Sequence, residues 1–398
     1  MERLQKMIND TIKNYHVLVV SHYYARSNAG APSYEIVNYL LDKVKYLVYV
    51  EHPFPYASDN NSYIFIFKNG KKIKEFSISK ILKPDIFSYL QDFFYNNLIF
   101  LLLKKRFDLC IALDNLNTFS FLFWRKLHLI KKLVLYTIDY APYRFQNKLL
   151  NSIYHFIDRR ACYNCDCIWV LSERMIKGRM NNGVNPKRCA YNVAVPMGAD
   201  LSKIKLLPYE NINRFTIVFL GHLLQKQGLQ LVLEILTEIK KEIPQIKLII
   251  IGQGDYEYQL KKIATELEIN DVVEFKGFIR NHQEIEKILC HSTIGLAPYL
   301  QDKKSFTYFA DPGKIKVYLG CGLPVITTRF TVIADEIEKE NTGIVINYNR
   351  DELRKALLRL LQDDQYYQLA RKNAINLSKK YNFKNIYDNA IKQTLFNI

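Results

Sequence analysis

Two lysines beside a proline and a glycine mark the segment of this sequence best suited to bind an anion. Residues 311–326 read Asp-Pro-Gly-Lys-Ile-Lys-Val-Tyr-Leu-Gly-Cys-Gly-Leu-Pro-Val-Ile. Pro312 and Gly313 are typical of a helix start, whose unpaired backbone amides attract phosphate oxygens, and Lys314 and Lys316 add positive charge there. The later glycines predict the helix end, and the apolar residues after them predict a buried strand. The segment therefore predicts a phosphate-binding helix at the edge of a sheet.

The elements that must position this segment alternate between strand-like and helix-like patterns. In the first half the expected strands are 16–21, 46–50, 109–113, 132–136 and 168–171, the expected helices are 33–41 and 84–103, and 63–67 pairs with 72–77 as a hairpin. In the second half the expected strands are 215–220, 247–251, 272–275 and 294–297, and the expected helices are 229–243, 256–267 and 283–290. Strands that alternate with helices predict parallel sheets, so the fold class is α/β with two tandem doubly wound, Rossmann-like domains.

The domain boundary is expected in a polar stretch, 203–213, which separates the two series of strands. We therefore expect an N-terminal domain over residues 1–205 and a C-terminal domain over 206–380. Residues 381–398 form a final segment, with a helix over about 383–396.

Three more turns follow expected strands of the second domain and bring backbone close to a ligand. The first is the loop from Gly221 to Gly228, the second is Gly252-Gln253-Gly254, and the third is Phe275-Lys276-Gly277. Glycine permits close approach of the backbone to a phosphate or a base edge, and a helix N-terminus favours negative charge. Taken alone, the first loop is a weak signal, and an ordinary left-handed turn with no ligand is the alternative for the other two.

The four elements together resemble the donor site of retaining GT-B glycosyltransferases of the family 4-like group, also named glycosyl transferases group 1. The resemblance covers most of 214–380 and, more loosely, 15–200. It implies a GT-B fold with an interdomain cleft, an N-terminal acceptor domain, a C-terminal domain for the nucleotide sugar and a last helix that crosses back to the first domain. It also implies a metal-independent, retaining transferase whose donor substrate is a nucleotide diphosphate sugar of UDP or GDP type, with no further cofactor.

The sequence departs from the family pattern where charge is expected in the first loop. The family usually has Arg after the first glycine and Lys before the second, and here those positions are His222 and Gln227, with Lys226 one place early. His222 is either a diphosphate contact or a turn residue without a ligand.

A second departure concerns the pair of glutamates, eight residues apart, that the family uses near the donor sugar and on the ribose. Their positions here are Phe309 and Val317, whose side chains cannot accept a hydrogen bond. Either Asp311 and Lys314 take over these contacts, or the nucleotide is held differently, or catalysis has been lost. Tyr308 lies within reach of the site, and Asp311 alternatively caps the following helix.

In the first domain the candidate catalytic residues are His22 and Asp139, each at the carboxyl end of an expected strand. His22 opens a loop at the place where the family has a glycine-containing loop under the donor phosphates and the acceptor; the matching loop residues are Asn28, Gly30 and Ala31. Asp139 lies where relatives have His or Asp near the reacting sugar. Its carboxylate is suited to stabilise positive charge at the anomeric carbon or to orient the acceptor hydroxyl, or else it caps the next turn.

Charge and cysteine content restrict the partners and the compartment. The net charge is +17, and residues 1–205 have a net charge of +14 against +3 for 206–398, which favours an anionic partner of the first domain, unless it reflects only a lysine-rich composition. Seven scattered cysteines indicate a reducing compartment, and the cluster at 162, 165 and 167 lacks a fourth ligand at a usual spacing, so no metal site is expected. No apolar signal core or membrane span is apparent, which predicts a cytoplasmic protein.

Two segments combine aromatic and aliphatic residues with basic clusters, 93–106 and 119–132. This composition is typical of helices that rest in a bilayer interface, and the alternative is a packed core with a basic rim. We therefore expect a peripheral enzyme on the inner face of the plasma membrane, which glycosylates a glycan or lipid-linked acceptor in cell-surface polysaccharide assembly. The alternatives are a non-catalytic sugar-nucleotide-binding or scaffold protein and a GT-B epimerase or phosphorylase. A nucleic-acid partner is not expected, because no recognisable module interleaves aromatic residues with Arg.

Overall fold

The computed structural model describes residues 8, 10–23, 32–55, 57, 59–81, 85–302 and 305–396. It divides into two compact α/β units, Met1–Pro196 with Lys384–Ile398, and Met197–Phe383. These divisions lie nine residues before and three residues after the boundaries expected from the sequence. Residues 197–205 join the second unit because the Met197 amide donates to Asp311 Oδ2 at 2.8 Å, and Ala199 exchanges backbone hydrogen bonds with Tyr381 and Phe383.

The first unit contains an eight-stranded sheet in the order β4-β3-β2-β1-β5-β6-β7-β8. Its strands are β1 (His16–Tyr23), β2 (Tyr46–Pro53), β3 (Asn61–Lys68), β4 (Lys71–Ser79), β5 (Phe107–Leu113), β6 (Ile130–Thr137), β7 (Cys167–Val170) and β8 (Tyr191–Ala194). All neighbours are parallel except the β2–β3 and β3–β4 pairs. The predicted hairpin is confirmed, and it turns at Asn69 and Gly70 with φ of 48° and 76°, a conformation that Asn and Gly adopt most readily.

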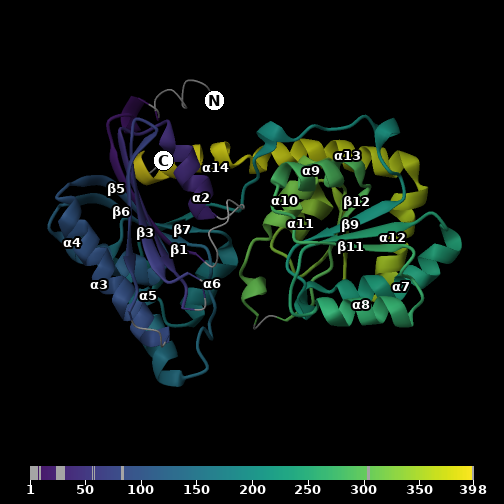
Figure 1. Cartoon of the computed structure of the whole chain (residues 1–398), viewed down its shortest axis with the longest axis horizontal. Helices are drawn as coiled ribbons and strands as arrows, with labels where there is room; N and C mark the ends of the chain where they lie inside the picture. The colour runs from purple at the N-terminus through teal and green to yellow at the C-terminus, as the bar shows by residue number, and fades with distance from the viewer. Residues whose placement is uncertain are drawn as a thin grey trace. The chain divides into compact units, whose positions relative to one another are not determined.

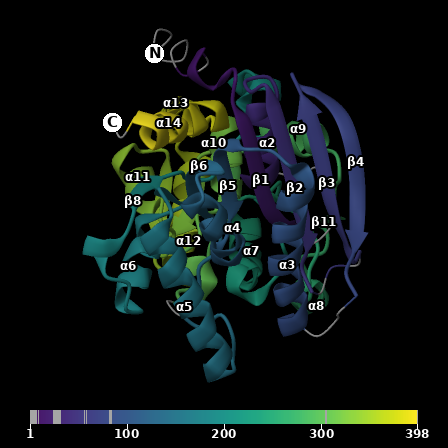
Figure 2. The ribbon, with the colours of Figure 1, turned by 90° about the vertical axis from the view of Figure 1, so that its left-hand side faces the viewer.

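Helices cover both faces of this sheet (Figures 1 and 2). They are α2 (Pro32–Leu41), α3 (Asp85–Leu103), α4 (Asn115–Lys126), α5 (Lys148–Asn164), α6 (Glu173–Asn181) and α14 (Phe383–Phe396). Figure 2 shows α3, α4 and α5 as one layer in front of the strands, with α2 and α14 on the other side. The predicted last helix is confirmed, and Trp169 Nε1 donates to Thr394 Oγ1 at 2.8 Å, which ties it to the first unit.

The second unit contains a six-stranded parallel sheet in the order β11-β10-β9-β12-β13-β14. Its strands are β9 (Thr216–Leu220), β10 (Lys247–Ile251), β11 (Val273–Gly277), β12 (Ile294–Ala297), β13 (Val325–Thr328) and β14 (Gly343–Ile346). Its helices are α7 (Leu229–Glu242), α8 (Glu257–Glu266), α9 (His282–His291), α10 (Gly313–Gly320), α11 (Ala334–Lys339), α12 (Arg350–Gln362) and α13 (Asp364–Ser378). The strands are short and almost wholly apolar because helices bury both faces of a parallel sheet. The predicted doubly wound α/β class is therefore confirmed in both units.

Each sheet has one place where the strand order reverses, and ligands of open α/β sheets bind beyond the carboxyl ends of the strands at that place. In the first unit the reversal lies between β1 and β5, which end beside His22 and Asp114. In the second unit it lies between β9 and β12, which end at Leu220 and Ala297.

Candidate functional site

Three glycine turns at the carboxyl edge of the second sheet are joined through their backbones. Gly221 and Gly252 follow β9 and β10, Gly277 ends β11, and their φ values are 140°, 136° and 65°. The Gly252 amide donates to Gly277 O at 2.8 Å, and the Gly221 amide donates to Ile251 O at 2.9 Å. A Cβ atom at Gly252 would lie 1.9 Å from Gly221 O, so only glycine fits there. The predicted turns thus lie side by side on one sheet edge.

The loop from Gly221 to Gly228 is likewise held against the neighbouring turn by a backbone hydrogen bond and a close approach at a glycine. The Leu223 amide donates to Gln253 O at 3.0 Å, and a Cβ atom at Gly254 would lie 2.4 Å from Leu223 O. The side chains of His222 and Gln253 are exposed, whereas Lys226 and Phe275 are partly buried.

Lys314 is the cation that the structure brings against this loop. It lies in the first turn of α10, its Nζ donates to Gln227 Oε1 at 2.7 Å, and the Nζ lies 3.9 Å from the centre of the Phe219 ring. A Cβ atom at Gly221 would lie 3.0 Å from the Nζ. Among the described residues no carboxylate is paired with Lys314, and burial holds the pKa of its ammonium well below the usual value.

Asp311 and Lys316 do not face the site as the sequence suggested. Both side chains are almost fully buried, and they form an ion pair with each other while Asp311 also accepts the Met197 amide. The expectation that Lys316 adds free charge at the helix start is therefore wrong, because Asp311 neutralises it. Asp311 ties α10 to the chain segment that enters the second unit, and it neither caps the helix nor stays open to a ligand.

The remaining predicted donor residues surround the start of α10. Pro312 directly precedes the helix and Gly313 begins it. The rings of Tyr308 and Phe309 lie 5.2 Å apart, and Phe309 is buried whereas Val317 is partly exposed. Sequence reasoning missed Tyr318, whose buried hydroxyl accepts the Leu220 amide at 2.6 Å and fixes the end of β9 against α10.

In the first unit, His22 is held between two carboxylates. Its Nδ1 lies 2.7 Å from Asp114 Oδ2, its Nε2 lies 3.1 Å from Asp92 Oδ2, and its side chain is 4% exposed. Burial acts to lower the pKa of His22, but the two carboxylates outweigh burial and raise it to about 9. His22 is therefore an imidazolium at neutral pH with both nitrogens donating, so it orients Asp114 and is not free to accept a proton.

Asp114 is a residue that sequence reasoning missed, although a polar residue after an apolar strand was the available signal. It directly follows β5 at the strand-order reversal and has φ of 104°, a strained conformation for aspartate. Its Oδ1 accepts the Asn117 amide at 2.8 Å and caps α4, while its side chain stays 31% exposed. Asp114 thus presents a carboxylate at the edge where a ligand of this unit is expected.

Asp139 lies two residues beyond β6 on the same edge, as expected. Its side chain is 45% exposed and forms an ion pair with Arg144. The predicted loop residues Asn28, Gly30 and Ala31 lie outside the described residues.

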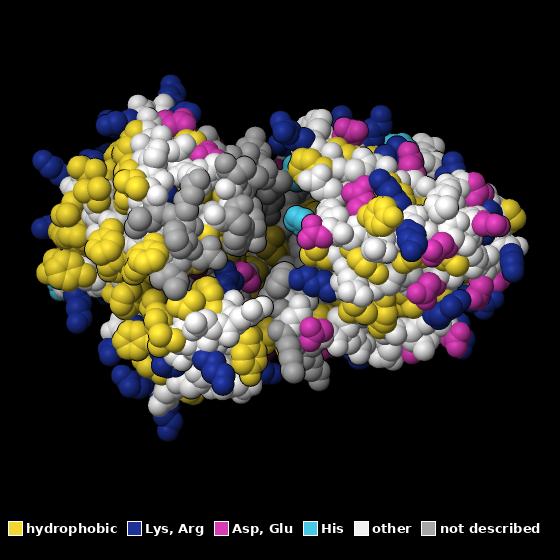
Figure 3. Space-filling model, turned by 60° about the horizontal axis from the view of Figure 1, so that its bottom comes forward, with side chains coloured by type: hydrophobic (Ala, Val, Ile, Leu, Met, Phe, Trp, Pro, Cys, Tyr) yellow, Lys and Arg dark blue, Asp and Glu magenta, His cyan; other side chains and the backbone are white. Residues whose placement is uncertain are grey.

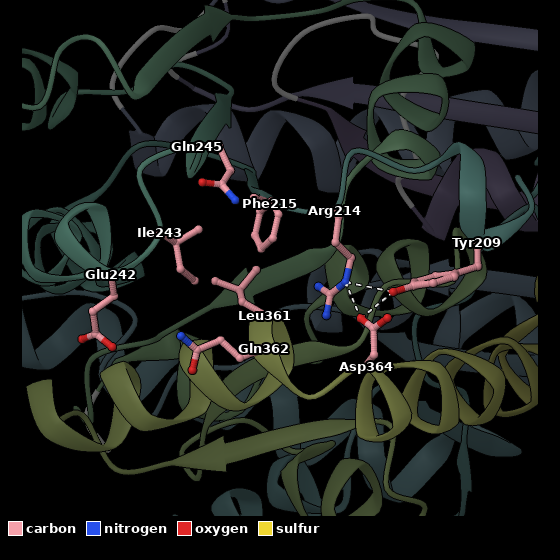
Figure 4. A pocket seen from close by; sticks show the side chains of 9 residues that line it. All are labelled: Tyr209, Arg214, Phe215, Glu242, Ile243, Gln245, Leu361, Gln362 and Asp364. Carbon is pink, nitrogen blue, oxygen red and sulfur yellow. Dashed lines mark hydrogen bonds and ion pairs between the residues drawn. The ribbon is translucent and has the colours of Figure 1, made fainter.

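A hollow of about 460 Å³ lies at the opposite, amino edge of the second sheet (Figure 4). Figure 4 shows Arg214 between Tyr209 and Asp364, with Arg214 Nε 3.0 Å from Asp364 Oδ1. This interaction ties the segment before β9 to α13 and is far along the strands from the glycine turns, so the hollow is separate from the predicted site.

In the part of the chain that the structure describes, no group of three or more His, Cys, Asp or Glu residues is placed to hold a metal ion. No helix of that part is long and apolar enough to cross a bilayer.

Comparison with known proteins agrees with this geometry. Residues 208–377 match the family model described as Glycosyl transferases group 1. Over 170 residues the chain is 27% identical to the amylovoran biosynthesis glycosyltransferase AmsK of Erwinia amylovora, an alignment that covers 42% of this chain and 41% of AmsK. The chain spans between about a third and a half of the length of the first curated relatives that it matches.

Solved structures match over nearly the whole chain. HepE of Anabaena in complex with UDP is 14% identical with a TM-score of 0.66, covering 96% of this chain and 100% of HepE. The sucrose-phosphate synthase of Thermosynechococcus elongatus is 13% identical with a TM-score of 0.69, covering 96% and 99%. The chain therefore has the GT-B fold, and its residues 208–377 match the glycosyl transferases group 1 family.

Proposed function

We propose that this protein is a glycosyltransferase that binds the diphosphate of a nucleotide sugar at the glycine turns of the second unit. The observation that carries the proposal is the ammonium of Lys314, which lies against Gly221 without a carboxylate partner among the described residues. A desolvated cation without a counter-ion is unfavourable, and a diphosphate oxygen would relieve that cost with a charge-assisted hydrogen bond.

This arrangement supplies the charge that the loop itself lacks. Gln227 occupies the position where the family has Lys. Its Oε1 accepts a hydrogen bond from Lys314 Nζ at 2.7 Å. In our proposal Lys314 reaches from α10 toward the diphosphate in place of a loop lysine, and the N-terminal amides of α10 add to the same positive field. HepE was solved with UDP, which supports a nucleotide ligand for this fold.

The proposed reaction type and acceptor rest on the resemblance to GT-B glycosyltransferases and on the names of the relatives. We propose a retaining, metal-independent transfer, in which the leaving diphosphate is stabilised by Lys314 and the α10 amides. The acceptor would be a lipid-linked saccharide in cell-surface polysaccharide assembly, bound by the first unit. The name of AmsK, an amylovoran biosynthesis glycosyltransferase, supports the biosynthetic role and not the lipid link.

A non-catalytic nucleotide-sugar-binding protein is the second candidate. Val317 and Phe309 favour it, because neither can make the hydrogen bonds of the family's two glutamates.

Titration of UDP and GDP into the full chain tests the binding step. We expect Lys314→Ala to weaken diphosphate binding by about tenfold or more, as the loss of a charge-assisted hydrogen bond implies. Lys262→Ala, on the exposed face of α8, is the matched control and should leave affinity unchanged. Equal affinities of both variants would contradict the proposed diphosphate site.

Release of free UDP or GDP from nucleotide sugars, measured with extracted lipid-linked saccharides as acceptors, tests the chemistry. Transfer by the unmodified chain supports the enzyme. Tight binding of donor without transfer to any of these acceptors would support the non-catalytic candidate instead.

A further inference from the structure

Helix α3 turns a row of large apolar side chains outward. Its exposed residues recur every three or four positions and therefore form one stripe along the helix. The stripe consists of Phe87, Leu90, Phe94, Leu98 and Leu101, which are between 45% and 64% exposed, and Leu102 beside it is 59% exposed. At 1.5 Å per residue, a helix of 19 residues is about 28 Å long, so the stripe is extended.

The opposite face of α3 buries polar side chains up to Asn96 and the apolar Ile99 and Phe100 near its end, so its first part inverts the usual pattern of a surface helix. Gln91, Asp92 and Asn96 are each at most 7% exposed. Asp92 pairs with Lys80 and His22, and Asn96 Oδ1 lies 2.9 Å from His52 Nε2. Rotation of α3 to bury the apolar stripe would break these bonds, so the fold itself holds the stripe outward.

Neighbouring helices widen the stripe into a surface. Phe123 and Leu127 at the end of α4, and Leu149, Ile153 and Phe156 on α5, are also between 46% and 69% exposed. Figure 3 shows hydrophobic side chains gathered over this layer of the first unit, whereas those of the second unit are scattered among charged residues. We refer to the exposed side chains of α3, α4 with Leu127, and α5 as the apolar face.

The charge around the apolar face is positive. Each carboxylate described between residues 87 and 166 has a cationic partner in the protein; these are Asp92, Asp108, Asp114, Asp139, Asp158 and Asp166. Exposed cations of the same layer form no described ion pair; these are Lys104, Lys105, Arg106, Lys126, Lys148 and Arg160. Arg125 and Lys131 belong to the basic segment 119–132 but pair with Asp166 and Asp108.

We propose that the apolar face docks in the interface of an anionic bilayer, with α3 lying in the membrane plane. Phe and Leu side chains would enter the acyl boundary, and the unpaired cations would contact acidic headgroups. A protein partner would have to present a large apolar surface rimmed by acidic residues, whereas an anionic bilayer has both properties everywhere. Docking would bring the enzyme to a lipid-linked acceptor, and only this role of the docking rests on the proposed function.

Cosedimentation of the full chain with vesicles tests the docking. The vesicles are phosphatidylcholine alone, or phosphatidylcholine with about one quarter phosphatidylglycerol. We expect binding to the anionic vesicles that falls as salt rises, with at least tenfold weaker binding to neutral ones. Phe94→Ser with Leu101→Ser should weaken anionic binding at least tenfold, and Lys104→Gln with Lys105→Gln and Arg106→Gln should reduce its dependence on salt.

The matched control is Tyr258→Ser with Leu369→Ser, which removes two similarly exposed side chains from the second unit and should leave vesicle binding unchanged. All variants should keep nucleotide affinity, which separates loss of docking from loss of the proposed donor site. Equal binding by the control and the α3 variant would overturn the proposal. Absence of vesicle binding, with a dimer that Phe94→Ser and Leu101→Ser dissociate, would assign the apolar face to a second copy of the chain instead.

Discussion

Replacing His22 by Gln should change how the stability of the first unit depends on pH. The carboxylates of Asp114 and Asp92 raise the pKa of His22 from 6.5 to about 9 in the folded protein. The folded state therefore binds more protons than the unfolded state between pH 6.5 and about 9. The stabilisation by His22 is fully present below pH 6.5 and is lost as the pH rises through about 9. At about 1.4 kcal/mol per pKa unit, the shift corresponds to roughly 3 kcal/mol.

His52, which lies against the same cluster, has the opposite effect at lower pH. Burial, only partly offset by Asp92, lowers its pKa from 6.5 to about 4. The unfolded state then binds more protons between pH 4 and 6.5, so the stability contributed by this group rises with pH over that range. The two histidines together predict greatest stability near pH 6.5. Burial also lowers the pKa of Lys80, which makes stability rise with pH at the alkaline end and opposes the His22 effect there.

Urea unfolding followed by tryptophan fluorescence measures this effect in the first unit alone, because the two tryptophans of the chain, Trp124 and Trp169, both lie in that unit. The free energy of unfolding of the unmodified chain should fall by up to about 3 kcal/mol between pH 6.5 and 9 relative to His22→Gln. His282→Gln, an exposed residue of the second unit, is the control and should follow the unmodified chain. A difference between the unmodified chain and His22→Gln that does not vary with pH would refute the assignment of an imidazolium held by two carboxylates.

Two further substitutions examine the candidate sites. Gly252→Ala places a Cβ 1.9 Å from Gly221 O, so nucleotide affinity should fall at least tenfold in titration calorimetry. Gly183→Ala, also at positive φ but with no atom within 4 Å, should lose only about 1 kcal/mol of stability. Undiminished affinity of Gly252→Ala would remove the turns from the donor site. Asp139→Asn should lower transfer at least tenfold in a turnover assay and leave donor affinity intact, because a carboxylate at this edge is suited to stabilise a developing positive charge; normal turnover would restrict Asp139 to its ion pair with Arg144.

The periodicity of the sequence was sufficient to predict the main strands of both sheets. Short, mainly apolar runs predicted β1, β9, β10 and β12 to within two residues at each end, and Asn69-Gly70 predicted the hairpin. These features depend on local backbone preference and on burial of both faces of a parallel sheet, which a single sequence reveals. The division at 196/197 was not predictable in the same way, because it depends on the contact between Met197 and the distant Asp311.

The cluster around His22 also lay beyond local patterns. Its members come from residues 22, 52, 80, 92 and 114, and each alone is an ordinary polar residue. Only the packing of α3 against the sheet makes Asp92 a buried partner of His22 and Lys80. The aromatic and basic composition of 93–106 was visible in the sequence, but the outward orientation of the apolar stripe follows from that buried polar face.

At the donor site of the second unit, too, the sequence shows the residues but only the packing shows which of them are paired. Phe309 and Val317 cannot replace the two glutamates of the family pattern, and Asp311, the nearest carboxylate in the sequence, is consumed by Lys316 in a buried ion pair. What remains near the glycine turns is positive charge, since Lys314 contacts Gln227 and approaches Gly221. A site with Lys314 and backbone amides but without these carboxylates is suited to hold a diphosphate more firmly than a ribose. We therefore propose that contacts to the leaving diphosphate, rather than to the sugar ring hydroxyls, contribute most of the free energy of donor binding.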